Sequence, residues 1–320
     1  MSNKSENKAQ YTPFIKWVGG KRAIAAEILE KAGIDTKNPF KAYFEPFLGG
    51  GAMFFHLKNI GLIGPDTKVT LSDMNKSLIT TYGVIQKKCT KLISKLKEHE
   101  KNHGNLLWLE TKKGKSFSLF VQEQRPRLRE REQYYYYYVR DIYNDLHKKS
   151  KLSSDLKIDL AAAFIYLNRT GFNGMYRENA DGKMNIPCGR YSNPAIVNAG
   201  VLESASKALQ GVKIKHCPYQ DSLKLARPGS LVYFDPPYFE TFTDYNGGGF
   251  GEAEQKELAL LAGAVKSGVK VIISNSSNHF TRELYEKQGF ECDFINAARN
   301  INSDGQGRSK VKEIVAFKKS

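Results

Sequence analysis

The chain has 320 residues, of which 41% are hydrophobic and 12% aromatic, so it can bury a core without disulfides or metal ions. It contains no run of eighteen apolar residues, and its first thirteen residues lack an apolar core, so we expect neither a membrane span nor a signal peptide. The net charge of +16 predicts a polyanionic partner, of which nucleic acid is the commonest.

Short β-branched and aromatic runs, bounded by Gly, Pro or Asp, predict seven buried strands. In chain order these are Ala42–Glu45, Lys68–Ser72, Val212–Cys217, Ser230–Asp235, Val269–Ser274, Gly289–Ile295 and Lys312–Phe317. Helical patterns lie between many of them, at Arg22–Ala32, Ala52–Lys58, Met74–Lys88 and Glu252–Ser267. The alternation predicts an α/β fold with a mostly parallel sheet and helices on both faces.

The stretch from 81 to 194 differs from the rest, because it is basic, aromatic and helical in pattern. It predicts a domain inserted into an α/β domain that is formed by residues 1–80 and 195–320. Between residues 86 and 151, 17 Lys and Arg face 8 Asp and Glu. This basic balance favours nucleic acid, although charge alone is also typical of a solvated surface.

Five consecutive tyrosines, Tyr134–Tyr138, lie within this insertion. On a helix they would point in different directions, since neighbours are about 100° apart. Either they stack on bases, or Tyr135, Tyr138 and Ile142 form a buried stripe; we expect the buried stripe.

A glycine-rich turn, Phe47–Gly51, follows the first strand and opens a helix. Asp73 ends the next strand, where it could accept hydrogen bonds from ribose hydroxyls. The dinucleotide fingerprint is incomplete, because Phe54 replaces its third glycine. This pattern is therefore compatible with a nucleotide site or with a structural turn.

A hydrophobic strand delivers Asp235 to the carboxyl edge of the predicted sheet, and Pro236 and Pro237 then stiffen the backbone. Since prolines lack an N–H group, Asp235 and the Pro236 carbonyl present two acceptors to the two hydrogens of an amino group. Tyr238 adds a flat face beside them. Although an Asp-Pro-Pro turn can be structural, this arrangement predicts a site that holds the exocyclic amino group of a planar base for attack on an electrophile.

Several motifs follow one another in a characteristic order along residues 13–318. They are Pro13–Lys21 (PFIKWVGGK), Phe47–Gly51, Leu71–Asn75 (LSDMN), Tyr166–Arg177, Asn185–Tyr191 and Asp235–Tyr238. Through them the chain resembles the Dam-type family of S-adenosylmethionine-dependent DNA adenine-N6 methyltransferases. The resemblance implies a seven-stranded Rossmann-like methyltransferase sheet, with an antiparallel edge hairpin from the last strand or two and an inserted helical target-recognition domain.

The resemblance also implies S-adenosylmethionine as cofactor and assigns site residues. The catalytic tetrapeptide is Asp235, Pro236, Pro237 and Tyr238. Cofactor contacts are expected at Trp17, Lys21, Phe47, Gly49, Gly51, Asp73 and Asp235, and Asp221 is a further candidate for the cofactor's adenine amino group.

Duplex DNA is the implied substrate, read at GATC with the target adenine rotated out of the helix. The expected DNA contacts are Lys16, Phe172, Asn173, Met175, Arg177, Pro187, Arg190 and Tyr191. Arg177 is expected to bind guanine O6 and N7, and Phe172 and Asn173 to intrude where the adenine leaves the stack. Ser192 replaces a lysine of some relatives, which puts one phosphate contact in doubt. A polar loop that caps helices is the structural alternative for 168–175.

Two turn-rich segments complete the prediction. Phe239–Gly251 is expected to order as a lid over the flipped base. Arg299–Lys312 is expected to be either a DNA-side loop or a mobile hairpin.

Other activities fit less well. Variants of the tetrapeptide with Asn-Pro-Pro followed by Tyr or Phe resemble RNA or protein-glutamine methyltransferases, and Ser-Pro-Pro-Tyr resembles cytosine-N4 enzymes. Asp235 and the basic insertion both favour DNA adenine. A DNA-binding regulator on an inactive methyltransferase scaffold is the alternative outside enzymes. Four scattered cysteines without a CxxC pair predict a cytoplasmic protein without a metal site. A cognate restriction endonuclease is a candidate genetic partner.

Overall fold

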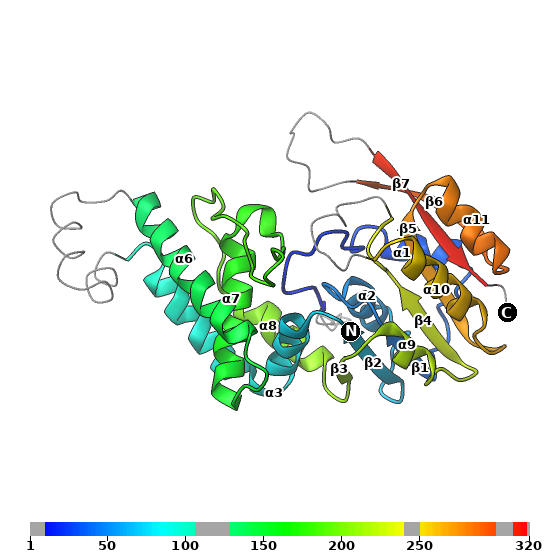
Figure 1. The fold of residues 1–320 in the computed structure, drawn as a ribbon. Helices are drawn as coiled ribbons and strands as arrows, with labels where there is room; N and C mark the ends of the chain where they lie inside the picture. Colours follow the sequence, from blue (N-terminus) through cyan, green and yellow to red (C-terminus); the bar gives the residue numbers. More distant parts are fainter. Residues whose placement is uncertain (1–9, 106–127, 240–249, 299–309, 319–320) are drawn as a thin grey trace, which may run out of the picture. The chain divides into compact units, whose positions relative to one another are not determined.

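The computed structural model describes residues 10–105, 128–239, 250–298 and 310–318, which form two compact units (Figure 1). The first unit consists of Met1–Pro13, Val18–Asn75 and Lys207–Ser320. The second consists of Phe14–Trp17 and Lys76–Ser206, so its bounds are wider than the predicted insertion at 81–194. Within the described ranges, no helix is both long and apolar enough to cross a membrane.

The first unit contains a seven-stranded sheet with the strand order β3-β2-β1-β4-β5-β7-β6. Neighbouring strands are parallel except for β7, which is antiparallel to both β5 and β6. The predicted α/β fold is therefore confirmed, and β6 rather than the last strand lies at the edge. The strands are β1 (Ala42–Glu45), β2 (Lys68–Asp73), β3 (Lys213–His216), β4 (Ser230–Phe234), β5 (Lys270–Ser276), β6 (Glu291–Ala298) and β7 (Lys310–Phe317).

The central strands are buried on both faces, which explains their nearly continuous apolar sequences. Val232 and Phe234 of β4 join a core cluster with residues of α9 (Tyr219–Leu223), α10 (Glu252–Gly263) and α11 (His279–Lys287). Leu231 and Tyr233, which alternate with them along β4, are equally buried. Two further helices, α1 (Ala25–Lys31) and α2 (Ala52–Asn59), complete this unit's early part.

The strand order reverses at β1, which lies between β2 and β4. In doubly wound sheets, ligands bind at the carboxyl ends of the strands beside such a reversal. The glycine turn follows β1, Asp73 ends β2, and Asp235 follows β4. The topology therefore brings three of the predicted motifs to one edge of the sheet.

The second unit is helical. It contains α3 (Lys76–Asn102), α6 (Leu128–His147), α7 (Ser154–Thr170), the 3-10 turn η1 (Phe172–Gly174) and most of α8 (Ala199–Ala208). The predicted helix Met74–Lys88 ends where α3 has a kink, at Lys88 (φ −140°), after which the helix continues. Tyr143 of α6 and Phe164 and Tyr166 of α7 are buried in its aromatic core.

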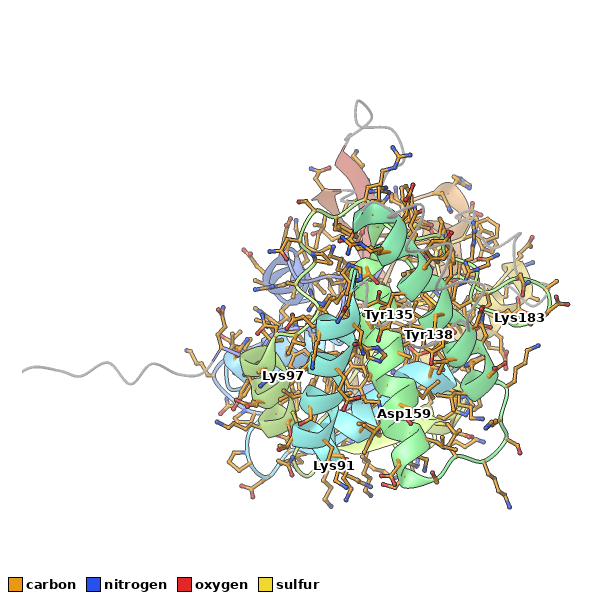
Figure 2. All side chains as sticks on the ribbon, turned by 90° about the vertical axis from the view of Figure 1, so that its left-hand side faces the viewer. Lys91, Lys97, Tyr135, Tyr138, Asp159 and Lys183 are labelled. Atoms are coloured by element: carbon orange, nitrogen blue, oxygen red, sulfur yellow. The ribbon has the colours of Figure 1, made fainter. Side chains whose placement is uncertain are left out.

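The five tyrosines lie on α6, and the expected stripe is wrong in part. Tyr135 and Tyr136 are buried, whereas Tyr138 is half-buried and its ring centre lies 6.2 Å from that of Tyr135 (Figure 2). The buried stripe continues through Val139 and Tyr143 rather than Ile142. The reason is that α6 packs against α7, where Tyr166 contacts both buried tyrosines.

Candidate active site and recognition segment

A cluster of charged side chains surrounds the end of β4 in the first unit. The Lys21 Nζ atom lies 2.8 Å from Asp235 Oδ1 and 4.0 Å from Glu313 Oε2 of β7. It also donates to the Gly19 carbonyl at 2.5 Å and lies 4.8 Å from the centre of the Tyr238 ring. The Lys21 side chain is only 2% exposed, so one buried ammonium faces two carboxylates.

Burial raises the pKa of Asp235 to about 6, although the neighbouring Lys21 opposes the rise. The carboxyl group is therefore mostly ionised at neutral pH and can accept hydrogen bonds. Burial without Lys21 would favour the neutral acid, which is a donor. Lys21 thus keeps the Asp235 carboxylate, which is only 20% exposed, in the form that an amino-group donor requires.

A buried polar network of Gln255, Asn275 and Tyr285 holds the backbone of the Asp235–Tyr238 turn. Gln255 Nε2 donates to the Pro237 carbonyl at 2.9 Å, and Gln255 Oε1 accepts from Asn275 Nδ2 at 2.9 Å. Asn275 Nδ2 also donates to Tyr285 Oη at 2.8 Å. Because Pro237 has no N–H group, the carbonyl is its only hydrogen-bonding group, and this contact helps to fix the backbone of the turn.

A second group of contacts holds the glycine turn after β1. Gly49 and Gly51 have φ values of 47° and 69°, a left-handed region that glycine adopts without strain. The Gly49 N–H donates to Asp73 Oδ2 at 3.0 Å, and the Asn75 N–H donates to Asp73 Oδ1 at 2.9 Å. Asp73 therefore joins the end of β2 to the turn that follows β1.

Glu45 lies beneath this turn and was not among the predicted site residues. Its Oε2 atom accepts from Tyr43 Oη at 2.7 Å and from the Phe54 N–H, in the first turn of α2, at 3.1 Å. Burial raises the pKa of Glu45 to about 8. The carboxyl group thus joins α2 to β1 through its hydrogen bond with the Phe54 N–H.

Phe47 and Asp221 occupy the side of the first unit near β3 and α9. The Phe47 ring stacks on Tyr219 at 5.4 Å and meets the ring of Phe250 edge-on at 5.4 Å. Asp221 pairs with Lys224 at 3.0 Å and is exposed. Asp221 is therefore less fixed than Asp73, and its cofactor role stays a prediction.

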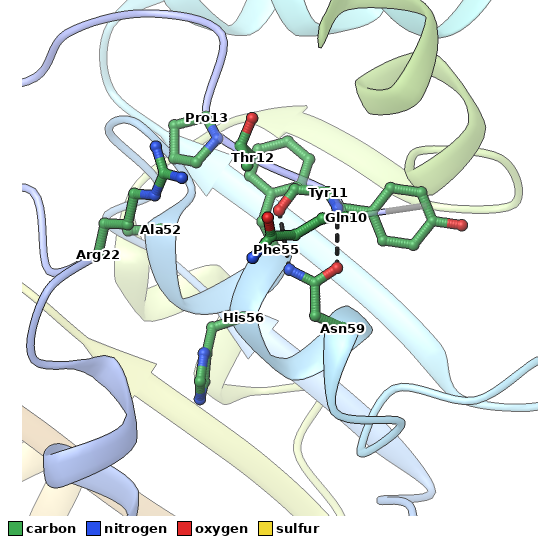
Figure 3. A pocket seen from close by; sticks show the side chains of 9 residues that line it. All are labelled: Gln10, Tyr11, Thr12, Pro13, Arg22, Ala52, Phe55, His56 and Asn59. Atoms are coloured by element: carbon green, nitrogen blue, oxygen red, sulfur yellow. Dashed lines mark hydrogen bonds between the residues drawn. The ribbon is translucent and has the colours of Figure 1, made fainter. Parts of the chain in front are cut away.

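A pocket in the first unit contains none of the predicted site residues (Figure 3). The Asn59 side chain binds both the N–H and the carbonyl of Tyr11 at 2.8 Å, which fastens the chain before residue 14 to α2. The pocket is lined by Gln10, Tyr11, Thr12, Pro13, Arg22, Ala52, Phe55, His56 and Asn59.

In the second unit, the segment 14–17 is attached to the end of α7. Asn168 accepts from the Lys16 N–H at 2.9 Å and donates to the carbonyls of Lys16 and Gly174, both at 2.8 Å. The Trp17 ring stacks on Tyr176 with 6.1 Å between ring centres. Trp17 and Lys21, which are predicted cofactor contacts from one motif, thus belong to different units.

The turn after α7 has an unusual backbone. Asn173 has a φ of 54° and is the only non-glycine residue with a positive φ in the described chain. This conformation is strained for a side chain and is common at functional sites. Its neighbour Phe172 is 40% exposed, and the Phe172 N–H donates to the Pro187 carbonyl at 2.9 Å.

All eight predicted DNA contacts lie in this unit. Arg177 Nε donates to Asn185 Oδ1 at 2.8 Å, and Lys16 Nζ lies 3.4 Å from Tyr191 Oη. Pro187 and Arg190 are exposed, and Met175 is half-buried. Each residue's contact with DNA stays a prediction.

Parts of the two predicted mobile segments, 240–249 in Phe239–Gly251 and 299–309 in Arg299–Lys312, lie outside the described residues. Among the residues that are described, no group of three or more His, Cys, Asp or Glu side chains is placed to hold a metal ion.

Comparison with known proteins places this arrangement in a family. The chain is 31% identical to the type II methyltransferase M1.LlaDCHI of Lactococcus lactis subsp. cremoris, over 97% of this chain and 96% of that protein. It is 36% identical to the type II methyltransferase M.MjaIII of Methanocaldococcus jannaschii, over 92% and 94%. It is 30% identical to the DNA adenine methylase of Escherichia coli K12, over 96% and 95%. Residues 17–301 match the D12 class N6 adenine-specific DNA methyltransferases. The chain therefore belongs to this family of adenine-specific DNA methyltransferases, as its resemblance to Dam-type enzymes predicted.

Proposed function

We propose that this enzyme transfers a methyl group from S-adenosylmethionine to N6 of adenine in duplex DNA at GATC, after rotating the target base out of the helix. The observation that carries the proposal is the cluster of Lys21, Asp235 and Glu313 beside the fixed Asp235–Tyr238 turn. The cytoplasm is the proposed compartment, and a cognate restriction endonuclease stays a candidate genetic partner.

The family implies a methyl donor of the S-adenosylmethionine type, and the residues at the carboxyl edge of the sheet fit such a group. Two carboxylates around one ammonium leave an excess negative charge, which suits a sulfonium cation. Asp73, fixed beside the glycine turn, suits hydroxyl donors of a ribose. We propose that Lys21, Phe47, Gly49, Gly51, Asp73 and Asp235, together with Trp17 and Asp221, hold the cofactor, which supplies an electrophilic methyl group.

The residues of the turn would act on the adenine amino group. The Asp235 carboxylate and the Pro236 carbonyl accept its two hydrogens, which localises the nitrogen lone pair for attack on the methyl carbon. Tyr238 offers its ring for stacking. N6 would gain the methyl group as the carbon–sulfur bond of the donor breaks, which leaves a neutral thioether. The extra proton on N6 would then be strongly acidic, so its loss needs no strong base. Positioning can contribute as much as about 7–11 kcal/mol to such a reaction.

The second unit would select the DNA site. An arginine that binds guanine O6 and N7 bidentately contributes about 1–3 kcal/mol of discrimination, and Arg177 is the proposed reader. Lys16, Met175, Pro187, Arg190 and Tyr191 are proposed to contact base edges and backbone. Phe172 and Asn173 are proposed to fill the gap that the flipped adenine leaves, since unstacking costs a few kcal/mol.

The test is methylation of an unmethylated plasmid with S-adenosylmethionine, followed by mapping of N6-methyladenine by single-molecule sequencing. Methylation confined to GATC is the expected result, and Asp235→Ala is the control that should give none. Methyladenine at another motif would reject the proposed DNA contacts while keeping the chemistry. If the protein bound DNA and cofactor without forming methyladenine, it would be a DNA-binding regulator instead.

A further inference from the structure

One face of α6 binds the backbone of the segment that contains Asn185. Tyr136 Oη donates to the Ile186 carbonyl at 2.9 Å, and Arg140 Nη1 donates to the same oxygen at 3.1 Å. Asn144 Nδ2 donates to the Met184 carbonyl at 3.2 Å, and Asn144 Oδ1 accepts from the Met184 N–H at 2.8 Å. The three side chains are four residues apart, so they form a single row along the helix.

These bonds are made in the interior of the second unit. Tyr136, Asn144, Met184 and Ile186 are all buried. A carbonyl that loses its donor in such a place is left without water to replace it, which costs more than an exposed hydrogen bond is worth. The row therefore defines where the backbone on either side of Asn185 can lie.

Asn185 transmits this constraint to Arg177. Its N–H donates to the Arg177 carbonyl at 3.1 Å, and its Oδ1 accepts from Arg177 Nε at 2.8 Å. A guanidinium group is planar, so a fixed Nε orients the two terminal nitrogens as well. The direction in which Arg177 presents those nitrogens thus depends on α6, more than thirty residues earlier in the chain.

We propose that Tyr136, Arg140 and Asn144 are positioning residues for sequence discrimination, which act by holding Met184–Ile186 and, through Asn185, Arg177. The proposal rests on the proposed function, because it takes Arg177 as the reader of a guanine. It gives one member of the tyrosine run a role that needs no contact with DNA. None of the three residues was expected from the sequence.

The test compares Tyr136→Phe, Asn144→Ala and the double variant Tyr136→Phe/Arg140→Met with two matched controls. Tyr137→Phe removes a hydroxyl from the neighbouring, exposed position, and Asp145→Ala truncates an exposed side chain next to Asn144. The first measurement is amide hydrogen exchange over residues 172–189, where the N–H groups of Phe172, Met184, Asn185 and Gly189 are bonded. The second is the ratio of kcat/KM for the cognate site to that for a site changed at the base pair that Arg177→Ala ceases to distinguish.

We expect Tyr136→Phe to raise exchange in 172–189 and to lower the discrimination ratio by about 3-fold, since Arg140 still donates to the Ile186 carbonyl. Asn144→Ala and the double variant, which leave buried backbone groups unpaired, should lower the ratio by about 10-fold or more. The controls should change neither quantity, and cofactor binding should be the same in all five proteins.

Unchanged exchange in the double variant would overturn the positioning role itself. Faster exchange with an unchanged ratio, or an equal loss of rate on both sites, would show that the row only stabilises the fold. Methylation by the wild-type enzyme at a motif other than GATC would reject the proposed site but not the row, which is then judged at that motif. If no methyl transfer occurred, the same ratio would be measured as DNA affinity.

Discussion

In the first unit, charged side chains at the carboxyl edge of the sheet are paired and largely shielded from solvent, since Lys21, which is 2% exposed, contacts Glu313 and the 20% exposed Asp235. In the second unit, predicted DNA contacts such as Phe172 and Arg190 are exposed. Hydrogen bonds from other residues fix the backbone around them. The first arrangement sets the charge state of groups in a low-dielectric site, and the second sets the direction of groups that meet solvent.

This difference implies that substitutions in the two units should impair different properties of the enzyme. Removing a buried charge leaves its partner uncompensated and affects chemistry or stability on every DNA. Removing an exposed base contact changes which DNA is used, because the rest of the unit stays folded. A substitution in the first unit that altered only DNA selectivity, or one in the second unit that altered turnover on every DNA, would contradict this division.

The largest effect is expected from Asp235→Ala. It removes the proposed acceptor for the adenine amino group, so single-turnover methyl transfer should fall by at least about 10²–10³-fold. DNA affinity, measured by fluorescence anisotropy, should be nearly unchanged because the proposed DNA contacts all lie in the other unit. Asp66→Ala, at an exposed turn of the first unit, is the control. Appreciable turnover in Asp235→Ala would exclude the proposed mechanism.

The next largest effect is expected from Lys21→Met, which leaves Asp235 facing Glu313 without a cation. Removing one partner of a buried ion pair typically costs about 3–5 kcal/mol. The free energy of unfolding, measured with denaturant, should fall by an amount of this order. Adding Glu313→Gln should restore part of it, because one of the two carboxylates is then neutral. Lys31→Met is a matched control, since Lys31 and Asp293 form an exposed pair at 3.0 Å that contributes at most about 1 kcal/mol. Equal losses in the two lysine variants would contradict the role of burial.

A smaller and more selective effect is expected from Arg177→Ala. Discrimination at one base pair should fall by about 5- to 150-fold, which corresponds to about 1–3 kcal/mol. Turnover on the cognate site should change much less, and kcat/KM on single-base variants of the site would show which position is relaxed. A uniform loss of affinity for all sequences would instead identify Arg177 as a phosphate contact.

The strands were predictable because burial on both faces requires a short, nearly continuous apolar run, which is visible in the local sequence. The run Ser230–Asp235 and the observed β4 (Ser230–Phe234) differ by one residue, since Gly229 and Pro236 bound a short segment with a hydrophobic centre, residues 231–234. The order of β7 and β6 at the edge was less accessible, because it depends on the long-range pairing of β7 with β5, which leaves no local signature in either strand.

The site residues that escaped prediction are those whose partners are distant in the chain. Gln255 looks like a surface residue of α10 until its bonds to Pro237 and Asn275 are seen. The four-residue spacing of Tyr136, Arg140 and Asn144 was visible, but a polar row on a helix is usually solvated. Glu313 lies 292 positions after Lys21, and nothing local in its sequence marks it as a buried carboxylate.

The last expected effect is a pH dependence of stability that has opposite signs in the two units. In the first unit, burial raises the pKa of Glu45 from 4.5 to about 8 and that of Asp235 from 3.8 to about 6. The folded unit then holds protons that the unfolded chain has released, so its stability should fall as pH rises from about 4.5 to 8. Glu45→Gln, which keeps an acceptor for Tyr43 and Phe54, should flatten this fall.

In the second unit, burial lowers the pKa of His99 and His103 from 6.5 to about 4. Between these values the unfolded chain binds protons that the folded unit excludes, so stability should rise as pH rises from about 4 to 6.5, by about 1.4 kcal/mol per pH unit for each proton. His99→Gln should flatten the rise, since glutamine can still bond the hydroxyl of Tyr135, which lies 2.8 Å from His99 Nδ1. Hydrogen exchange at pH 4.5, 6 and 8, corrected for intrinsic rates, would resolve both slopes in one experiment. If stability changed with pH in the same direction in both units, the carboxyls and histidines named here would not dominate the titration of their own unit. The contrast between the two units would then concern catalysis and DNA selection but not the pH dependence of stability.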